Sequence, residues 1–167
     1  MSEGPLLTVE DLQVAYRGRS GLVPALMGVS FIVGRERVGI VGESGSGKST
    51  IGLAILRLLP QSARVSAKRL SLHETDLLAV DERAMRSIRG RRISMVLQDP
   101  KYSLNPVMTV GRQIAESYRV HSRASTREAR RKALEMLEAV RIRDPERVFQ
   151  LYPHEVSGGM GQRVMIA

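Results

Sequence analysis

A glycine-rich stretch in the first third of the chain has the residue types of a phosphate-binding loop. Residues 42–49 read GESGSGKS and fit the pattern G-x-x-x-x-G-K-[ST]. Glycine adopts positive φ without strain and leaves no Cβ in the path of a phosphate. The curled backbone can then turn its N–H groups inward, and a following helix adds the positive end of its dipole. The pattern therefore predicts a site for a nucleoside triphosphate.

Two side chains at the end of this loop have predicted roles. Lys48 is expected to place a point charge on the β and γ phosphates, and the Ser49 hydroxyl to hold Mg²⁺. The loop follows an apolar run at residues 37–41, typical of a strand buried on both faces, and precedes a helix-like run at residues 51–59. This order of strand, loop and helix is the context that the motif requires. A guanine-reading N-K-x-D sequence does not occur in the chain.

Two further polar segments stand where ligand chemistry is expected. Gln98 directly follows an apolar run at residues 93–97, and ligands bind at the carboxyl ends of strands in open α/β sheets. Ser157, Gly158 and Gly159 stand at a predicted helix start, a second place where backbone N–H groups can face an anion. The simpler alternatives are a surface glutamine at a turn and an ordinary helix N-cap with a flexible approach.

The alternation of apolar and polar residues predicts the elements that position these motifs. Strands are expected at residues 6–16, 29–33, 37–41, 69–73 and 93–97, and helices at residues 51–59, 81–89 and 110–118. Two more helices are expected, one after a capping box formed by Ser125 and Glu128 and one at Asp144-Pro145. The first of these two should bury a stripe made of Ala129, Ala133, Leu137 and Val140.

Composition restricts the class of protein. The 167 residues are 43% hydrophobic and 26% charged, which is ordinary for a globular chain. The lack of cysteine excludes a disulfide scaffold, a cysteine-ligated zinc site and an iron–sulfur cluster within these residues. No apolar run reaches the roughly 20 residues of a membrane span. The first residues have no apolar signal-peptide region, so a cytoplasmic location is expected.

The chain is basic, with 26 Lys and Arg residues against 17 Asp and Glu residues and a net charge of +9. Two interpretations fit this charge: contact with nucleic acid, or solvated helix faces near an acidic partner or an anionic membrane surface. Only 4% of the residues are aromatic, so the stacking side chains of a single-strand binder are scarce. The second interpretation is favoured, and no nucleic-acid partner is expected.

In order and spacing these motifs resemble the ATP-binding subunits of ABC transporters. Tyr16 matches the aromatic that stacks on adenine, Gln98 the Q-loop glutamine and residues 157–160 the signature motif. The resemblance also implies that Tyr16 and the residues of the Walker A loop contact ATP. These residues are Gly42, Glu43, Ser44, Gly45, Ser46, Gly47, Lys48, Ser49 and Thr50. The segments QDPKYSLNPVMTVGRQIAE and YPHEVSGGMGQRVMIA look more narrowly like the oligopeptide, dipeptide and nickel importers.

The resemblance also implies a mechanism and partners. Two such subunits, identical or related, dimerise head to tail, and each ATP lies between the Walker A loop of one and the signature of the other. Lys48 and Gln98 would be the catalytic residues, and Ser49 and Gln98 the contacts to Mg²⁺. The signature contacts across the dimer would come from Ser157, Gly158, Gly159 and Met160. Permease subunits, and indirectly an extracytoplasmic substrate-binding protein, would be partners of this peripheral subunit at the cytoplasmic face of the inner membrane.

The expected fold is α/β: a P-loop ABC ATPase with a β-rich N-terminal part, an inserted α-helical subdomain and an incomplete core sheet. Residues 1–98 would form the nucleotide-binding core, residues 99–156 the helical subdomain, and residues 157–167 the signature with the start of its helix. Three positions depart from the family pattern: Gly161 where the branch commonly has Arg, Leu97 before the Q-loop glutamine, and Val156 before the signature serine.

In the family, the Walker B aspartate, the glutamate after it and the switch histidine follow the signature helix. No apolar strand ending in Asp-Glu follows the signature in this sequence, although Mg²⁺-assisted hydrolysis needs such groups. The chain is therefore expected to be a fragment, inactive alone, of a subunit that couples ATP hydrolysis to the uptake of peptides or nickel. A non-hydrolysing nucleotide-binding module and a soluble ABC-type ATPase acting on DNA stay open as alternatives.

Overall fold

The structure, a computed structural model, describes residues 4–19, 21–97 and 103–167. The chain forms two compact units, which meet in the sequence between Arg89 and Gly90. The first unit holds a β-sheet and two helices, and the described elements of the second unit are helical. The division expected at residue 98 stays a prediction.

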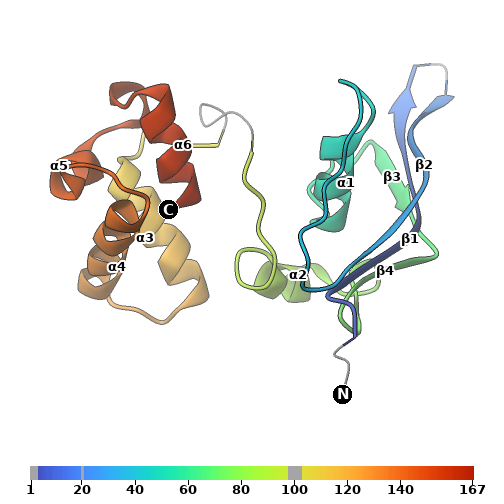
Figure 1. Cartoon of the computed structure of the whole chain (residues 1–167), viewed down its shortest axis with the longest axis horizontal. Coiled ribbons are helices and arrows are strands. Elements are labelled where there is room, and N and C mark those ends of the chain that lie inside the picture. The colour runs from blue at the N-terminus through green and yellow to red at the C-terminus, as the bar shows by residue number, and fades with distance from the viewer. Residues whose placement is uncertain (1–3, 20, 98–102) are drawn as a thin grey trace. The chain divides into compact units, whose positions relative to one another are not determined.

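The sheet of the first unit is antiparallel and has five strands: β1 (Leu7–Gly18), β2 (Gly21–Val33), β3 (Ala63–Ser66), β4 (Arg69–Leu72) and β5 (Thr75–Asp76). β1 is central, with β2 along one edge and β3 and β4 along the other (Figure 1). The strands predicted at residues 6–16, 29–33 and 69–73 are confirmed. β2 is longer than predicted, because its half from Gly21 to Met27 pairs with β1 despite Pro24. Gly28, with a positive φ, stands at the register shift between this half and Val29.

Two helices complete the first unit, α1 (Lys48–Ile55) and α2 (Glu82–Ile88). α1 begins at Lys48, earlier than the predicted residue 51, because Gly47 ends the preceding loop in a left-handed conformation and serves as N-cap. α2 begins after Asp81, whose carboxylate accepts a hydrogen bond from Ala84 N (2.7 Å). Apolar side chains of the sheet and both helices are buried, among them Leu12, Val14, Leu70, Ile51, Ala54 and Met85.

Two predicted strands do not form. Residues 37–41 form neither strand nor helix, and Val38, Ile40 and Val41 are exposed to 44%, 46% and 95%. Residues 93–97 contain a single bridge residue, Ile93, and Val96 is 56% exposed. An apolar run shows that a segment suits burial on both faces, but a strand also needs hydrogen-bonded neighbours. No described segment forms a ladder with either run, so the prediction was wrong for this structure.

In its described residues, the second unit has four α-helices and a short 3₁₀ helix: α3 (Val110–His121), α4 (Thr126–Ala139), α5 (Pro145–Gln150), η2 (Pro153–Glu155) and α6 (Gly158–Ile166). These helices pack around a hydrophobic core of their own. The predicted helices are confirmed. Ala129, Ala133 and Leu137 form the buried stripe of α4, and Val140 packs against the core as its C-cap. None of the helices in the described ranges is long and apolar enough to cross a membrane.

Short-range capping sets most of these helix starts. Ser125 Oγ accepts a hydrogen bond from Glu128 N (3.2 Å), and the Asp144 carboxylate accepts one from Arg147 N (3.3 Å). Thr109 is the N-cap of α3 by position, but no cap hydrogen bond reaches its side chain. Side-chain acceptors of this kind satisfy the free N–H groups of a first helical turn.

Candidate nucleotide-binding site

The loop between residues 37–41 and α1 has backbone features of an anion-binding turn. Gly45 and Gly47 adopt φ values of +83° and +90°, in the region that favours glycine. Residues 42–46 are exposed, so the loop is open to a ligand. α1 begins directly at the end of the loop, so its free first-turn N–H groups and the positive end of its dipole lie next to the loop.

Lys48 folds back over this loop. Its ammonium donates hydrogen bonds to the carbonyl oxygens of Gly42 (2.8 Å) and Glu43 (2.5 Å) and to Ser46 Oγ (3.2 Å). A positive charge is therefore centred on the loop rather than extended into solvent. A phosphate held by the loop N–H groups would meet this charge at close range, which is the arrangement that electrostatic stabilisation of a triphosphate requires.

Close packing explains why residue 47 is glycine and constrains residue 42 less. A Cβ on Gly42 would lie 2.8 Å from Ser46 Oγ, a hydroxyl that can rotate away. A Cβ on Gly47 would lie 2.6 Å from Leu26 Cδ2 and 3.1 Å from the carbonyl oxygen of Ala25, both in β2. The loop thus rests on β2, and buried Leu26 supports its last glycine. Sequence reasoning missed Leu26, since alternation within β2 indicates that it is buried but not which loop it touches.

Tyr16, the candidate for stacking on adenine, lies near the end of β1. It is half-buried and is paired with Val23 of β2 and Ala63 of β3. It follows Val14 by two residues, and Val14 pairs with Leu26, the residue beneath Gly47. One stretch of the sheet therefore carries both the candidate aromatic and the support of the phosphate loop.

The second candidate loop begins α6. Ser157 is its N-cap, and Ser157 Oγ accepts a hydrogen bond from Met160 N (3.3 Å). Ser157, Gly158 and Gly159 are exposed. A Cβ built on Gly158 or Gly159 would have no atom within 4 Å, and neither residue has a positive φ. Neither packing nor backbone conformation within the described part of the chain therefore requires glycine at these two positions.

The remaining candidate residues differ in what the structure says of them. Gln98, predicted to contact Mg²⁺ or the attacking water, lies outside the described residues. Gly161, one of the three departures from the family pattern, is buried in α6. His154 stacks on the ring of Tyr152, with centroids 5.7 Å apart and planes inclined by 16°, so it has a packing contact beside the second loop.

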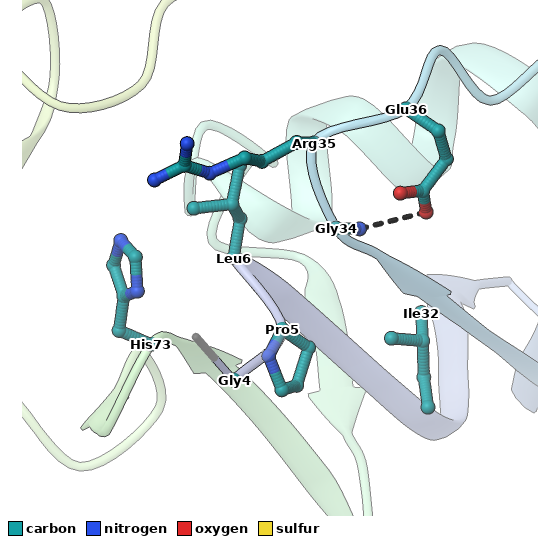
Figure 2. Close-up of a pocket in the computed structure, with 8 residues that line it drawn as sticks. All are labelled: Gly4, Pro5, Leu6, Ile32, Gly34, Arg35, Glu36 and His73. Carbon is teal, nitrogen blue, oxygen red and sulfur yellow. Dashed lines mark hydrogen bonds between the residues drawn. The ribbon is translucent and has the colours of Figure 1, made fainter. Parts of the chain in front are cut away.

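A cavity of the first unit is separate from these loops. It is lined by Gly4, Pro5, Leu6, Ile32, Gly34, Arg35, Glu36 and His73, with none of the phosphate-loop residues among them (Figure 2). The Glu36 carboxylate accepts a hydrogen bond from Gly34 N (2.8 Å), and this bond lowers the pKa of Glu36. The carboxylate is thus engaged with its own turn, and no group of three His, Asp or Glu side chains within the described ranges is placed to hold a metal ion.

The fold and the first loop define a P-loop nucleotide-binding protein. The family described as "ABC transporter" matches residues 26–167, which include both candidate loops, and the chain belongs to this family. The fold is accordingly that of an ABC ATPase, a family that binds ATP. A bacterial ABC transporter cassette solved as a dimer superposes with a TM-score of 0.70 at 25% identity, covering 96% of this chain and 67% of that chain.

Curated relatives are more similar in sequence. A "probable peptide ABC transporter ATP-binding protein" of Sinorhizobium fredii is 54% identical over 164 residues, which are 97% of this chain and 49% of the relative. A dipeptide transport ATP-binding protein of Haemophilus influenzae is 44% identical over 163 residues, which are 97% of this chain and 49% of the relative. The chain spans about half the length of the curated relatives that it matches.

Proposed function

We propose that this chain is the nucleotide-binding part of the ATP-binding subunit of an ABC importer for peptides. The observation that carries the proposal is the loop at residues 42–49, where two glycines in positive φ, a helix start and the Lys48 ammonium converge. Peptide is the favoured substrate class, because the relatives at 54% and 44% identity carry peptide and dipeptide transport in their names. Nickel, the other substrate that the resemblance implied, has no such support from these two relatives.

In this proposal the first loop binds the triphosphate of ATP in cis. Loop N–H groups and the Lys48 ammonium bind the phosphate oxygens, and the Ser49 hydroxyl binds Mg²⁺. Tyr16 stacks on adenine, and Gln98 contacts Mg²⁺ or the attacking water. Bound Mg²⁺ supplies charge neutralisation on the phosphates. The exposed loop and the folded-back lysine fit a polyanionic ligand, and the buried Leu26 keeps the last glycine in place.

The second loop binds ATP in trans, from a second ATPase subunit. Gly158 and Gly159 are not required by the packing of their own chain, which supports a role in close approach to a ligand or partner. Ser157 is exposed and would meet the γ-phosphate with Gly158, Gly159 and Met160. The dimer would dock on permease subunits as a peripheral protein at the cytoplasmic face of the inner membrane. An extracytoplasmic binding protein would deliver the substrate.

Nucleotide binding and hydrolysis are separable in this proposal. Binding uses residues of this chain, whereas hydrolysis also needs a carboxylate ligand for Mg²⁺ and a group that positions water. In the family pattern these groups follow the signature helix. We therefore assign hydrolysis to the complete subunit and expect these 167 residues alone to bind ATP without turnover.

Uptake into vesicles tests the proposed function. The complete subunit is assembled with its permease and binding protein in proteoliposomes, and MgATP is supplied on the side of the subunit. Accumulation of a labelled peptide that requires hydrolysable ATP is expected. Accumulation of labelled nickel ions but not of peptide would contradict the substrate class, and absence of any ATP-dependent uptake would contradict the importer function.

A further inference from the structure

We propose that Arg89 is a positioning residue for the phosphate loop, because it holds the opposite end of α1 in place. The loop ends at Gly47 and α1 begins at Lys48, so whatever fixes the C-terminal end of α1 also fixes the loop. The inference rests on the proposed function, since it assigns a task to Arg89 in binding the nucleotide.

Arg89 lies at the C-cap of α2, and its guanidinium spans from α2 to the end of α1. Nε donates to the carbonyl oxygen of Leu56 (2.7 Å), and Nη2 donates to the carbonyl oxygen of Arg57 (3.1 Å). On its other side the guanidinium pairs with the carboxylate of Glu82, with Nη1 2.6 Å from Oε1. The side chain is 20% exposed, so these bonds form largely away from water.

The end of α1 needs such a partner. The carbonyls of Gly52, Leu53 and Ala54 accept backbone hydrogen bonds, whereas the last carbonyls of an α-helix have no intrahelical donor. Arg89 supplies donors to the carbonyls of Leu56 and Arg57, and its positive charge suits the negative end of the helix dipole. No basic residue of α1 itself stands in its last turn.

Arg57 fixes the same helix end from another direction. It adopts φ +52°, in the left-handed region usually occupied by glycine after a helix C-cap. Its Nη1 donates to the carbonyl oxygens of Val80 (2.6 Å) and Leu77 (3.3 Å), in the segment that leads into α2. Arg57 and Arg89 thus connect the end of α1 with α2 and its approach through four hydrogen bonds to backbone carbonyl oxygens, and the ion pair with Glu82 holds the Arg89 guanidinium on α2.

The length of α1 makes this anchoring relevant to the loop. Its eight residues span about 12 Å, so the helix moves as one rigid piece. A tilt at the Arg89 end changes the direction of the N–H groups at Lys48 and Ser49, which must point at the phosphates. Arg89 therefore contributes to nucleotide binding through orientation, without touching the nucleotide.

The test compares Arg89 with Arg86 in the complete subunit. Arg89→Met removes the bonds to α1, whereas Arg86→Met removes a second cation beside the same carboxylate. Arg86 Nε lies 3.9 Å from Glu82 Oε1, and its side chain is 80% exposed. Arg89→Lys keeps the charge but cannot form the forked contact. MgATP dissociation constants are measured by titration at a temperature where every variant is folded, with the folded fraction checked by circular dichroism.

We expect Arg89→Met to weaken MgATP binding by roughly tenfold and Arg89→Lys by less, while Arg86→Met binds as the wild type does. Guanidinium ion at low millimolar concentration should restore part of the affinity of Arg89→Ala, whose short side chain leaves room for the ion beside the Leu56 and Arg57 carbonyls. Wild-type affinity in folded Arg89→Met, or a loss in Arg89→Ala that guanidinium leaves unchanged, would overturn the inference. Failure of the wild-type subunit to bind MgATP would instead contradict the proposed function.

Discussion

At the scale of single residues, two glycines of the phosphate loop share a backbone conformation but differ in surroundings. Gly45 has φ +83° with open space at its Cβ position, and Gly47 has φ +90° with Leu26 and the Ala25 carbonyl in contact range. Gly45→Ala should cost about 1–2 kcal/mol of unfolding free energy from strain alone. Gly47→Ala should cost a further ~1–3 kcal/mol, since its methyl group displaces Leu26 or the backbone. Denaturant unfolding of the complete subunit measures both.

The comparison has its own control. Leu26→Ala in the Gly47→Ala background removes the clash, so the double variant should be less destabilised than the sum of the single changes. Equal destabilisation by Gly45→Ala and Gly47→Ala would contradict the contact between Gly47 and β2.

At the scale of elements, substitutions of Ser157, the N-cap of α6, can separate its role in helix stability from its proposed role in binding ATP. Ser157→Ala should cost about 0.5–2 kcal/mol, because Met160 N loses its acceptor. Aspartate is as good an N-cap as serine, so Ser157→Asp should be as stable as the wild type. Its carboxylate would nevertheless repel the γ-phosphate, and ATP hydrolysis by the complete subunit should be lost.

The matched control is Ser125, which caps α4 with the same geometry. Ser125→Ala and Ser125→Asp should reproduce the two stability effects without changing ATP hydrolysis. Full hydrolysis by Ser157→Asp would argue against contact between the signature loop and the γ-phosphate.

A second element-scale prediction concerns the packing of α3 on α5. Gly111 is buried in α3, and a Cβ there would lie 2.0 Å from Cγ of Phe149. The ring of Phe149 therefore packs directly on the helix backbone, with the Arg130 guanidinium 5.2 Å from its centroid. Gly111→Ala should cost about 3 kcal/mol or more of unfolding free energy, which is an overpacking effect.

Truncation of the ring should reverse part of this cost. A double-mutant cycle of Gly111→Ala with Phe149→Leu should give a coupling of about 1–3 kcal/mol in favour of the double variant. Additive effects of the two substitutions would show that the close contact is absent in solution.

At the scale of the whole molecule, carboxylates in both units set a common pH dependence. Hydrogen bonds lower the pKa of Glu82, through Arg89, and the pKa of Glu135, through Lys132, below the ordinary value of 4.5. A carboxylate with a lowered pKa in the folded state stabilises the fold above its unfolded value and loses this effect as pH falls through the folded value. The thermal midpoint should therefore decrease as the pH is lowered below about 4.5, the ordinary pKa of these carboxylates.

Both carboxylates are partly exposed, so the change should be small and sensitive to salt. The double variant Glu82→Gln/Glu135→Gln should have a shallower dependence over the same interval, measured by differential scanning calorimetry. An unchanged slope would mean that neither ion pair contributes to stability in solution.

The sequence predicted the local features well and the long-range ones less well. Helix starts at Asp81, Ser125, Asp144 and Ser157 depend on bonds to N–H groups three residues ahead, so the residue types alone carry the information. The phosphate loop was predictable for the same reason, since its glycines and Lys48 interact within eight residues.

Features that depend on distant partners were not predictable. The apolar runs at residues 37–41 and 93–97 were predicted as strands, but strands need pairing neighbours, and no described segment pairs with them as a ladder. The contact of Arg89 with Leu56 spans 33 residues, and an arginine near the end of a charged helix gives no signal of it. The contact of Leu26 with Gly47 was missed for the same reason. The alternation of residues in β2 predicts that Leu26 is buried but not which residue it contacts.

Binding of MgATP to the complete subunit tests the central claim most directly. Lys48→Ala removes the ammonium that lies on the loop, and Lys68→Ala removes a lysine of the same unit that pairs with Glu10. Since a hydrogen bond to a charged group contributes ~1.5–3 kcal/mol, Lys48→Ala should weaken MgATP binding by about 10- to 100-fold. Lys68→Ala should bind as the wild type does. Equal affinity of Lys48→Ala and the wild type for MgATP would contradict the account.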